Sequence, residues 1–217
     1  MARRRSPGQR AGLSREAVLD AALVIADRDG LAGLTMRRLG AELGVEAMTL
    51  YHHLPNKDAL LDGLVERVLE LATQPERDER PWADGLRDYA STLRATLLRH
   101  PGVLPLVATR PAVTPGTLRT VERSLAVLCA AGFPLGTALD LVNALTVFVV
   151  GHVAAEVATA AVNERGKPGS TGHVAGLDPA EFPLLTRAAR LGLGTDDATR
   201  FTTSVDALLA GFGTLLG

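Results

Sequence analysis

The chain has 217 residues, of which 47% are hydrophobic and 22% are charged, a balance that excludes an intrinsically disordered chain and can fill a sizeable core. Aromatic residues make up only 4%, so the core must consist of Leu, Val and Ala, which suits packed helices better than a β-sandwich. The single cysteine, Cys129, excludes an internal disulfide framework and a cysteine-based zinc site.

The first twelve residues concentrate positive charge. The net charge of the chain is −1, but residues 1–58 hold nine Arg and Lys against seven Asp and Glu, and Arg3, Arg4, Arg5 and Arg10 supply the excess. No apolar stretch follows these arginines, so the segment is not a signal peptide. We predict a disordered basic arm over residues 1–12 that contacts nucleic acid; a solubilising tail is the alternative.

No run of residues is apolar for long enough to span a membrane. The longest charge-free runs cover residues 124–139 and 141–155, which is short of the ~18–20 apolar residues that a membrane helix needs. We therefore expect a soluble, cytoplasmic protein of the all-α class.

Residues 13–72 are predicted to form a first helical domain. Ser14 is a good N-cap for one helix and Thr35 for a second. Gly44 stands where a helix ends in a left-handed residue, and a short helix resumes at about residues 46–52. Asn56 caps a longer fourth helix. Apolar residues recur at helical spacing through these segments: Val18, Leu19, Ala22, Ile25, Ala26, Met36, Leu39, Leu43, Leu60, Leu61, Leu64, Val65, Val68 and Leu71.

The segment 35–53 combines two short helices with a tight glycine turn. This arrangement predicts a helix-turn-helix unit, whose second helix enters the major groove of DNA. An ordinary helical hairpin with a solvated polar face fits the same pattern. In the first interpretation Arg37, Tyr51 and Lys57 contact phosphates and thereby position the protein. The full set of expected DNA contacts is Thr35, Arg37, Ala47, Met48, Thr49, Tyr51, His52, His53 and Lys57.

Residues 73–217 are predicted to form a second helical domain for regulation and dimerisation. Helices are expected over residues 82–98, 117–131 and 135–162, and near the C-terminus. Residues 135–162 are apolar around the whole circumference of the helix, so it must be covered on all sides. The terminal helix repeats apolar residues at spacings of four and three, which suits a helix pair or bundle. We place the dimer interface on these two helices, with the alternative that both seams fill a monomer core: Leu139, Val142, Leu145, Val149, Phe201, Val205, Leu208 and Phe212.

Residues 164–180 are rich in Gly and Pro. We predict a mobile loop there, long enough to gate a site.

Several isolated residues could suggest other chemistry. His152 and Glu156 share one helix face and could hold a metal or a proton, but a buried contact is the simpler interpretation, since no second ligand pair accompanies them. His100 before Pro101 indicates helix termination, and Cys129 is expected to be a small buried hydrophobe. No phosphate-binding loop or nucleophile–base motif is present, so we predict that the protein is not an enzyme.

The motif residues carry a family resemblance. Residues 34–45 (LTMRRLGAELGV), 48–53 (MTLYHH) and 56–61 (NKDALL) resemble the N-terminal domain of tetracycline-repressor (TetR) family transcriptional regulators. The similarity spans residues 13–71 without a gap. In the second domain, residues 108–111 (ATRP), 125–133 (LAVLCAAGF) and 182–185 (FPLL) resemble the tetracycline-repressor subgroup.

The resemblance implies a homodimer held by a four-helix bundle and a ligand cavity in the second domain. In that subgroup the cavity binds a magnesium–tetracycline chelate. The positions that match its binding set hold Thr73, Tyr89, Leu93, Leu106, Thr109, Ser124 and Ala155. Only Thr109 retains the subgroup residue, and Leu106 replaces the metal-facing histidine, so Mg²⁺ would lose a direct contact. We expect a metal-free, mainly apolar cavity with no cofactor, in which Tyr89, Thr109 and Ser124 supply polar contacts; an empty or collapsed pocket is the alternative.

The reading helix also departs from the subgroup. Ala47 stands at a position that commonly carries a base-reading amide, and Met48 follows it. Both side chains could touch a thymine methyl group but cannot form paired hydrogen bonds to a base. We therefore expect an operator that differs from the tetracycline operator.

These features together predict a dimeric repressor of a palindromic DNA operator, released by a small-molecule inducer. Inducer binding would pivot the helix over residues 56–71 and change the spacing of the two reading heads. The alternatives are an activator or an inducer-independent DNA binder, a helical carrier of small molecules without DNA binding, and a helical enzyme that uses His152 and Glu156.

Overall fold

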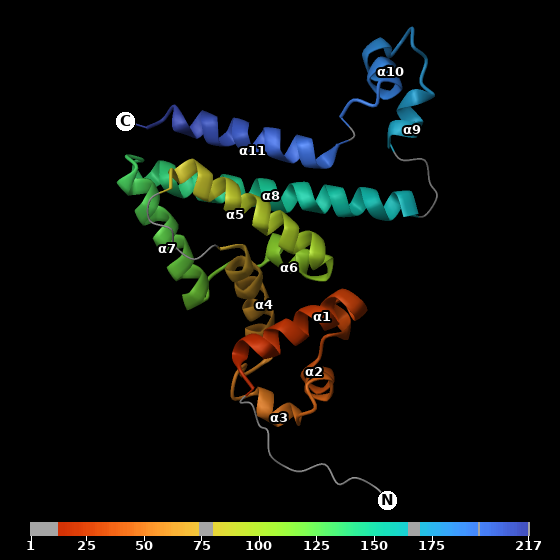
Figure 1. The fold of residues 1–217 in the computed structure, drawn as a ribbon. Helices are drawn as coiled ribbons and strands as arrows, with labels where there is room; N and C mark the ends of the chain where they lie inside the picture. Colours follow the sequence, from red (N-terminus) through yellow and green to blue (C-terminus); the bar gives the residue numbers. More distant parts are fainter. Residues whose placement is uncertain (1–12, 74–79, 165–169, 195, 217) are drawn as a thin grey trace, which may run out of the picture.

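The computed structural model describes residues 13–73, 80–164, 170–194 and 196–216 (Figure 1). Every regular element in these ranges is a helix, which confirms the all-α prediction. The predicted basic arm lies outside the described residues. The elements are α1 (Arg15–Gly33), α2 (Met36–Glu42), α3 (Ala47–Leu50), α4 (Lys57–Ala72), α5 (Trp82–Arg99), the short 3₁₀ helix η1 (Pro101–Val103), α6 (Leu104–Thr109), α7 (Pro115–Ala130), α8 (Leu135–Glu164), α9 (Ser170–Ala175), α10 (Pro183–Arg190) and α11 (Asp197–Gly213).

Three of the first four helices, α1, α2 and α4, begin where side-chain caps predict. Ser14 Oγ accepts from the backbone N of Ala17 at 3.1 Å, Thr35 Oγ1 from Arg38 N at 3.2 Å and Asn56 Oδ1 from Ala59 N at 2.8 Å. Each bond satisfies a backbone donor that has no partner within its helix. Gly44 has φ 67°, a conformation that glycine adopts without strain, and it turns the chain from α2 into α3.

These helices surround a compact apolar core. Leu19, Leu39, Leu50, Leu60 and Leu64 are fully buried, and they come from α1, α2, α3 and α4. The reading helix α3 is therefore anchored by one leucine while its other side chains face outward. The predicted helix over 46–52 is shorter in the structure, because residues 51–53 form turns after Leu50.

The second group of helices packs around α5 and α8. In Figure 1 the long helices α5, α8 and α11 run alongside one another, and α4 leads from them to α1, α2 and α3. The contact between α5 and α8 buries Leu93, Leu97, Leu141 and Leu145 completely. Gly132, with φ 104°, separates α7 from α8 as expected.

The predicted interface residues include four that are interior to a single chain. Leu145 and Val149 on α8, and Phe201 and Val205 on α11, are at most 3% exposed. They pack α11 against α8 and α5 within the same chain, so almost none of their surface is left for a second copy. The heptad-like spacing identified a real helix pair, but both helices belong to one chain. Of the other four residues, Leu139 is 46% exposed, and Val142, Leu208 and Phe212 are half-buried.

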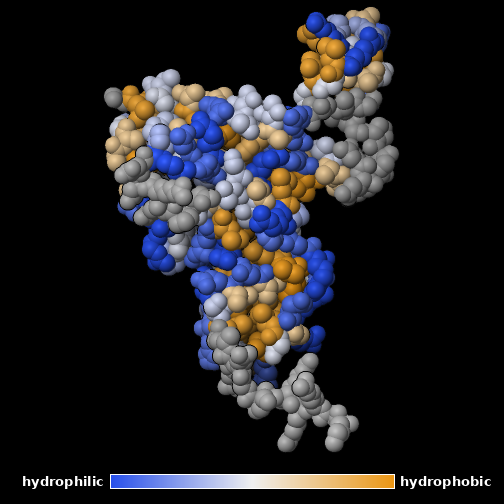
Figure 2. Space-filling model, in the orientation of Figure 1, coloured by the Kyte–Doolittle hydropathy of each residue, from blue (hydrophilic) through white to orange (hydrophobic). Residues whose placement is uncertain are grey.

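Two further predictions need correction. Cys129 is exposed rather than buried, because it lies on the outward side of α7 while its neighbour Leu128 faces the core. The predicted mobile loop contains a helix, α9 (residues 165–169 lie outside the described residues), which packs against α10. In Figure 1 this pair stands apart from the other helices, and Figure 2 shows apolar side chains gathered on it. They include Leu184, Leu185, Leu191 and Leu193, which are between 50% and 76% exposed.

Helix α8 is long and apolar. By length and composition alone, its residues Leu135–Ala161 could cross a membrane, although the charge-free runs of the sequence are shorter. Asp140 interrupts those runs without ending the helix. Core helices of soluble proteins meet the same criterion. Only 28% of the most apolar stretch of α8 is buried within the chain, so much of the apolar surface of this helix is exposed in a single copy.

Candidate nucleic-acid interface and its link to the second domain

The helix-turn-helix residues form one exposed surface on α2, α3 and the start of α4. Met48 and Tyr51 are 69% and 41% exposed, and Thr49 and His52 are also exposed. Buried Leu50 holds α3 from behind. The structure places the remaining predicted contact residues on the same elements, with Ala47 and His53 half-buried and the others exposed: Thr35, Arg37, Ala47, His53 and Lys57.

Two arginines near this surface are neutralised by neighbouring carboxylates. Arg28 pairs with Asp29 at 2.9 Å and with Glu42 at 3.0 Å, and Arg38 pairs with Asp29 at 2.8 Å. These ion pairs connect the end of α1 with α2. They hold the two helices at a defined angle and leave little net charge there.

Arg37 and Lys57 differ from those arginines. Both are exposed, and within the described ranges neither takes part in an ion pair. Arg37 stands in the first turn of α2 and Lys57 is the first residue of α4, so the two cations precede and follow α3 along the chain. Both are available to phosphates of a nucleic acid that contacts α3.

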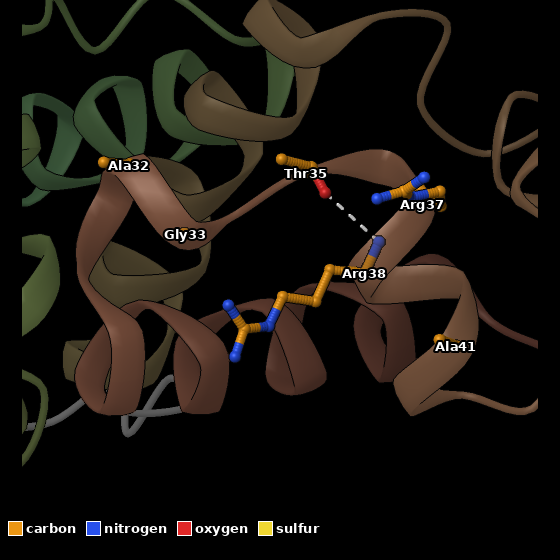
Figure 3. A pocket seen from close by; sticks show the side chains of 6 residues that line it. All are labelled: Ala32, Gly33, Thr35, Arg37, Arg38 and Ala41. Atoms are coloured by element: carbon orange, nitrogen blue, oxygen red, sulfur yellow. Dashed lines mark hydrogen bonds between the residues drawn. The ribbon is translucent and has the colours of Figure 1, made fainter.

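A surface hollow of about 420 Å³ opens at the start of α2 (Figure 3). Its wall includes Thr35, whose hydroxyl accepts from the backbone N of Arg38, and the side chains of Arg37 and Arg38. The complete lining is Ala32, Gly33, Thr35, Arg37, Arg38 and Ala41. None of the residues predicted to bind a ligand contributes to this hollow.

The predicted ligand residues are not all brought together. Leu93 and Leu106 are buried, whereas Thr109 and Ala155 are exposed. The hydroxyls of Thr109 and Ser124 donate to backbone carbonyls one turn earlier in their own helices, at 2.7 and 3.1 Å. Ala155 points away from the core, so the structure gives it no place in a cavity of this chain alone.

Tyr89 is a half-buried polar residue between α5 and α8. Its Oη lies 3.4 Å from Thr146 Oγ1 on α8. Burial raises the pKa of the Tyr89 phenol above its ordinary value near 10, and the Thr146 hydroxyl offsets this only in part. The phenol therefore stays protonated in the folded chain and can donate a hydrogen bond inside the second domain.

This environment predicts how stability changes at high pH. Above about pH 10 the unfolded chain loses the Tyr89 proton while the folded chain keeps it, so the free energy of unfolding should fall as pH rises further. In a Tyr51→Phe background, which leaves one tyrosine, tyrosinate absorbance should appear at a higher pH in the folded protein than in the denatured protein. Tyr89→Phe should remove this part of the pH dependence. Reversible ionisation near pH 10 in the folded protein would contradict the prediction.

Asp27 of α1 binds the second domain with both carboxylate oxygens. His100 Nδ1 lies 2.7 Å from Oδ2, and the backbone N of Gly102 donates to Oδ1 at 3.1 Å. A Cβ atom at Gly102 would overlap the carbonyl oxygen of Ala26 and lie 2.8 Å from the backbone N of Asp27. Glycine is therefore required where η1 meets α1. His100 does end α5 as predicted, but its second role was not visible in the sequence.

Arg110, directly after α6, holds the other side of the helix-turn-helix domain. Its Nε donates to Asp62 at 2.6 Å and its Nη2 to Asp58 at 2.9 Å, both on α4. These bonds raise the pKa of the Arg110 guanidinium, with the bond to Asp62 the largest cause. Further along α4, buried Glu66 accepts from Arg15 of α1 at 2.8 Å. Helices α1 and α4 are thus both fixed from the second domain.

His152 and Glu156 serve the packing of the second domain. Glu156 accepts two hydrogen bonds from Arg94 of α5, at 3.1 and 2.7 Å, and the Arg94 guanidinium lies over the ring of Phe201. His152 Nε2 is buried 3.9 Å from Glu156. Among the described residues no three His, Cys, Asp or Glu side chains gather into a metal site.

Comparison with known proteins identifies both halves of the chain. The family described as "Bacterial regulatory proteins, tetR family" matches residues 18–64, and "Tetracyclin repressor-like, C-terminal domain" matches residues 74–216. The tetracycline repressor protein class D of Escherichia coli is 34% identical over 207 residues, which cover 93% of this chain and 90% of that protein.

Solved structures agree with these matches. ActR of Streptomyces coelicolor without ligand superimposes with a TM-score of 0.77 at 28% identity, covering 95% of this chain and 98% of ActR. ActR in complex with actinorhodin gives a TM-score of 0.76 at 27% identity and covers 95% and 100% of the two chains.

Proposed function

Because the chain belongs to the TetR family of helix-turn-helix transcriptional regulators, which are not enzymes, we propose that it is a homodimeric repressor of a two-fold symmetric operator and that a small molecule releases it. The observation that carries this proposal is the surface of α3. Buried Leu50 anchors this helix, and the exposed cations Arg37 and Lys57, which form no ion pair with any described residue, precede and follow it in the chain. A repressor of this kind acts on chromosomal DNA and therefore in the cytoplasm. We divide the chain into a basic arm (1–12), a DNA-binding domain (13–72) and a regulatory domain (73–217).

Two copies are needed because one short reading helix contacts few bases. A two-fold axis doubles the site and sets the reading helices about 34–36 Å apart, one turn of DNA. The outer face of α8 is the proposed contact, since it is apolar and uncovered in the single chain. Val147 and Leu139 are 63% and 46% exposed, and Gly151, Ala154 and Ala158 continue the same face as exposed small residues. Small residues allow two helices to approach closely.

The inducer is proposed to be a small molecule that binds in a mainly apolar part of the second domain without a metal. ActR binds actinorhodin, which supports a small-molecule ligand for a chain of the same fold. Leu106 offers no lone pair to a cation, so the side chains at this position do not fit a bound Mg²⁺. The phenol of Tyr89 would supply a polar contact.

The release mechanism uses the two connections between the domains. A ligand that displaces η1 or α6 would move α1 through Asp27 and α4 through Arg110. The separation of the two reading helices must match the DNA turn, so a small rotation of each domain lowers operator affinity. The inducer must then bind the released state more tightly, and a coupling of about 1–3 kcal/mol corresponds to roughly 5- to 150-fold.

The test is a selection of random-core duplex DNA by the purified protein, with Tyr51→Ala as the control. We expect one two-fold symmetric motif, lost or strongly weakened in the control. Affinity for that motif should fall steeply with added salt, and Lys57→Ala should reduce the salt slope by about one. Recovery of no motif by the folded protein at low salt would reject the proposal and favour a helical small-molecule carrier.

A further inference from the structure

The N-terminus of α3 differs from those of the other helices in the DNA-binding domain. Ser14, Thr35 and Asn56 each cap their helix with their own side chain. Glu46 occupies the same position before α3, yet its side chain makes no capping hydrogen bond. Its longer side chain is poorly suited to capping, and Glu46 is exposed. The carboxylate is therefore free to serve another purpose.

Glu46 is also unusual because, within the part of the chain that the structure describes, it has no cationic partner. Among the described residues of this domain, most carboxylates are paired. The pairs are Asp20 with Arg67, Asp27 with His100, Asp29 and Glu42 with Arg28, Asp58 and Asp62 with Arg110, Glu66 with Arg15, and Glu70 with Arg67. The exceptions are Glu46 and Glu16, and Glu16 lies in the first turn of α1, on a helix outside the α2–α3 reading unit.

An unpaired carboxylate on a DNA-binding surface is repelled by phosphates, so it lowers affinity unless it meets a hydrogen-bond donor on a base. In the major groove, cytosine presents the N4 amine with no acceptor beside it. Adenine presents its N6 amine next to the N7 acceptor, whereas guanine and the thymine O4 present acceptors. A carboxylate therefore favours cytosine by attraction and disfavours the other bases by repulsion.

No other side chain in the α3 segment is of a type that reads a base with paired hydrogen bonds. Residues 46–53 read EAMTLYHH and contain no Arg, Lys, Asn or Gln, the side chains that read guanine or adenine with paired hydrogen bonds. The first residues of a recognition helix are those that reach base edges. Glu46 immediately precedes Ala47 and Met48, so it stands at this end of the helix.

We propose that Glu46 is a specificity-determining residue that accepts a hydrogen bond from the N4 amine of one cytosine in each operator half-site. The inference rests on the proposed function, because it requires α3 to lie in the major groove. It adds a defined base at a defined contact and a reason why other bases are rejected there.

The experiment uses the duplex that the wild-type protein selects and three variants with that cytosine changed to each other base in both half-sites. Wild-type protein should prefer cytosine by about tenfold or more. Glu46→Ala should bind the cytosine duplex more weakly and the other three more tightly, so that the preference nearly disappears. Glu46→Gln should shift the preference toward adenine, since an amide matches the N6 and N7 groups. Glu16→Ala removes the same charge from the same domain and should leave the preference unchanged.

A base analogue tests the hydrogen bond itself. When 2-pyrimidinone, which lacks the N4 amine, replaces the cytosine, the wild-type protein should lose affinity and Glu46→Ala should not. Equal weakening of Glu46→Ala on all four duplexes, or equal sensitivity of both proteins to the analogue, would overturn the proposal. A selected motif without cytosine in its half-sites would overturn it too, and the proposed function would stand. Failure of the wild-type protein to select any duplex would instead reject the proposed function.

Discussion

Gly102→Ala is expected to weaken operator binding at least tenfold and to lower the free energy of unfolding by about 1–3 kcal/mol, the usual cost of forcing extra atoms into a packed contact. The added methyl group would overlap the carbonyl oxygen of Ala26. Since the backbone fixes the positions of both the Cβ atom and the carbonyl oxygen, neither can move aside by changing rotamer. Helix α1 must shift relative to η1, and the hydrogen bond from Gly102 to Asp27 is strained at the same time.

Gly85→Ala is the matched control for this variant. Gly85 lies inside α5, and a Cβ atom there meets nothing within 4 Å. Because alanine is the better helix former, Gly85→Ala should raise the free energy of unfolding by up to about 1 kcal/mol. Chemical denaturation and operator titration of the two variants measure both effects. Indistinguishable behaviour of the two would show that the α1–η1 contact neither stabilises the chain nor orients the reading domain.

Val147→Glu is expected to give a folded monomer and to reduce operator affinity by roughly 10²- to 10⁴-fold, the range of avidity that linking two binding sites provides. Val147 is 63% exposed on the outer face of α8, where a second copy is proposed to pack. A charge buried in that contact would lack a partner and would strongly oppose association. Sedimentation velocity measures the oligomeric state, and operator titration measures the affinity.

Leu118→Glu makes the same kind of change on α7. Leu118 is 53% exposed, so the substitution introduces an equal charge at a similarly exposed apolar position. This variant should remain dimeric and bind the operator normally. If Val147→Glu stays dimeric, the outer face of α8 is not the contact between copies. If Val147→Glu is a monomer that binds the operator with full affinity, operator binding does not require two copies of the chain.

The starts of α1, α2 and α4 were predictable because their determinants are local. The caps Ser14, Thr35 and Asn56 act on backbone groups three residues away, and Gly44 adopts the left-handed conformation that its position required. The exposed residues of α3 followed from the same local pattern. Each of these determinants lies within a few residues of the helix end or turn that it specifies.

Contacts between distant residues were not predictable in the same way. Asp27 and His100 are separated by 73 positions, and neither residue type nor spacing indicates the pair. The spacing of Phe201 and Val205 predicted a helix pair, but the same spacing serves a partner within the chain or outside it. Only burial in the structure resolved that choice. The orientation of Cys129 depends likewise on which face of α7 meets the core.

The double use of Asp27 limits how far reading domains can be exchanged between regulators. A chimera that carries residues 13–72 on a different second domain keeps α3 intact, yet its Asp27 carboxylate meets no histidine and no glycine amide unless the recipient supplies both. The carboxylates of Asp58 and Asp62 would also lack Arg110. We therefore expect operator recognition to transfer with residues 13–72 as a unit. The proposed response to a ligand should transfer only with a second domain that supplies the same contacts at η1 and after α6.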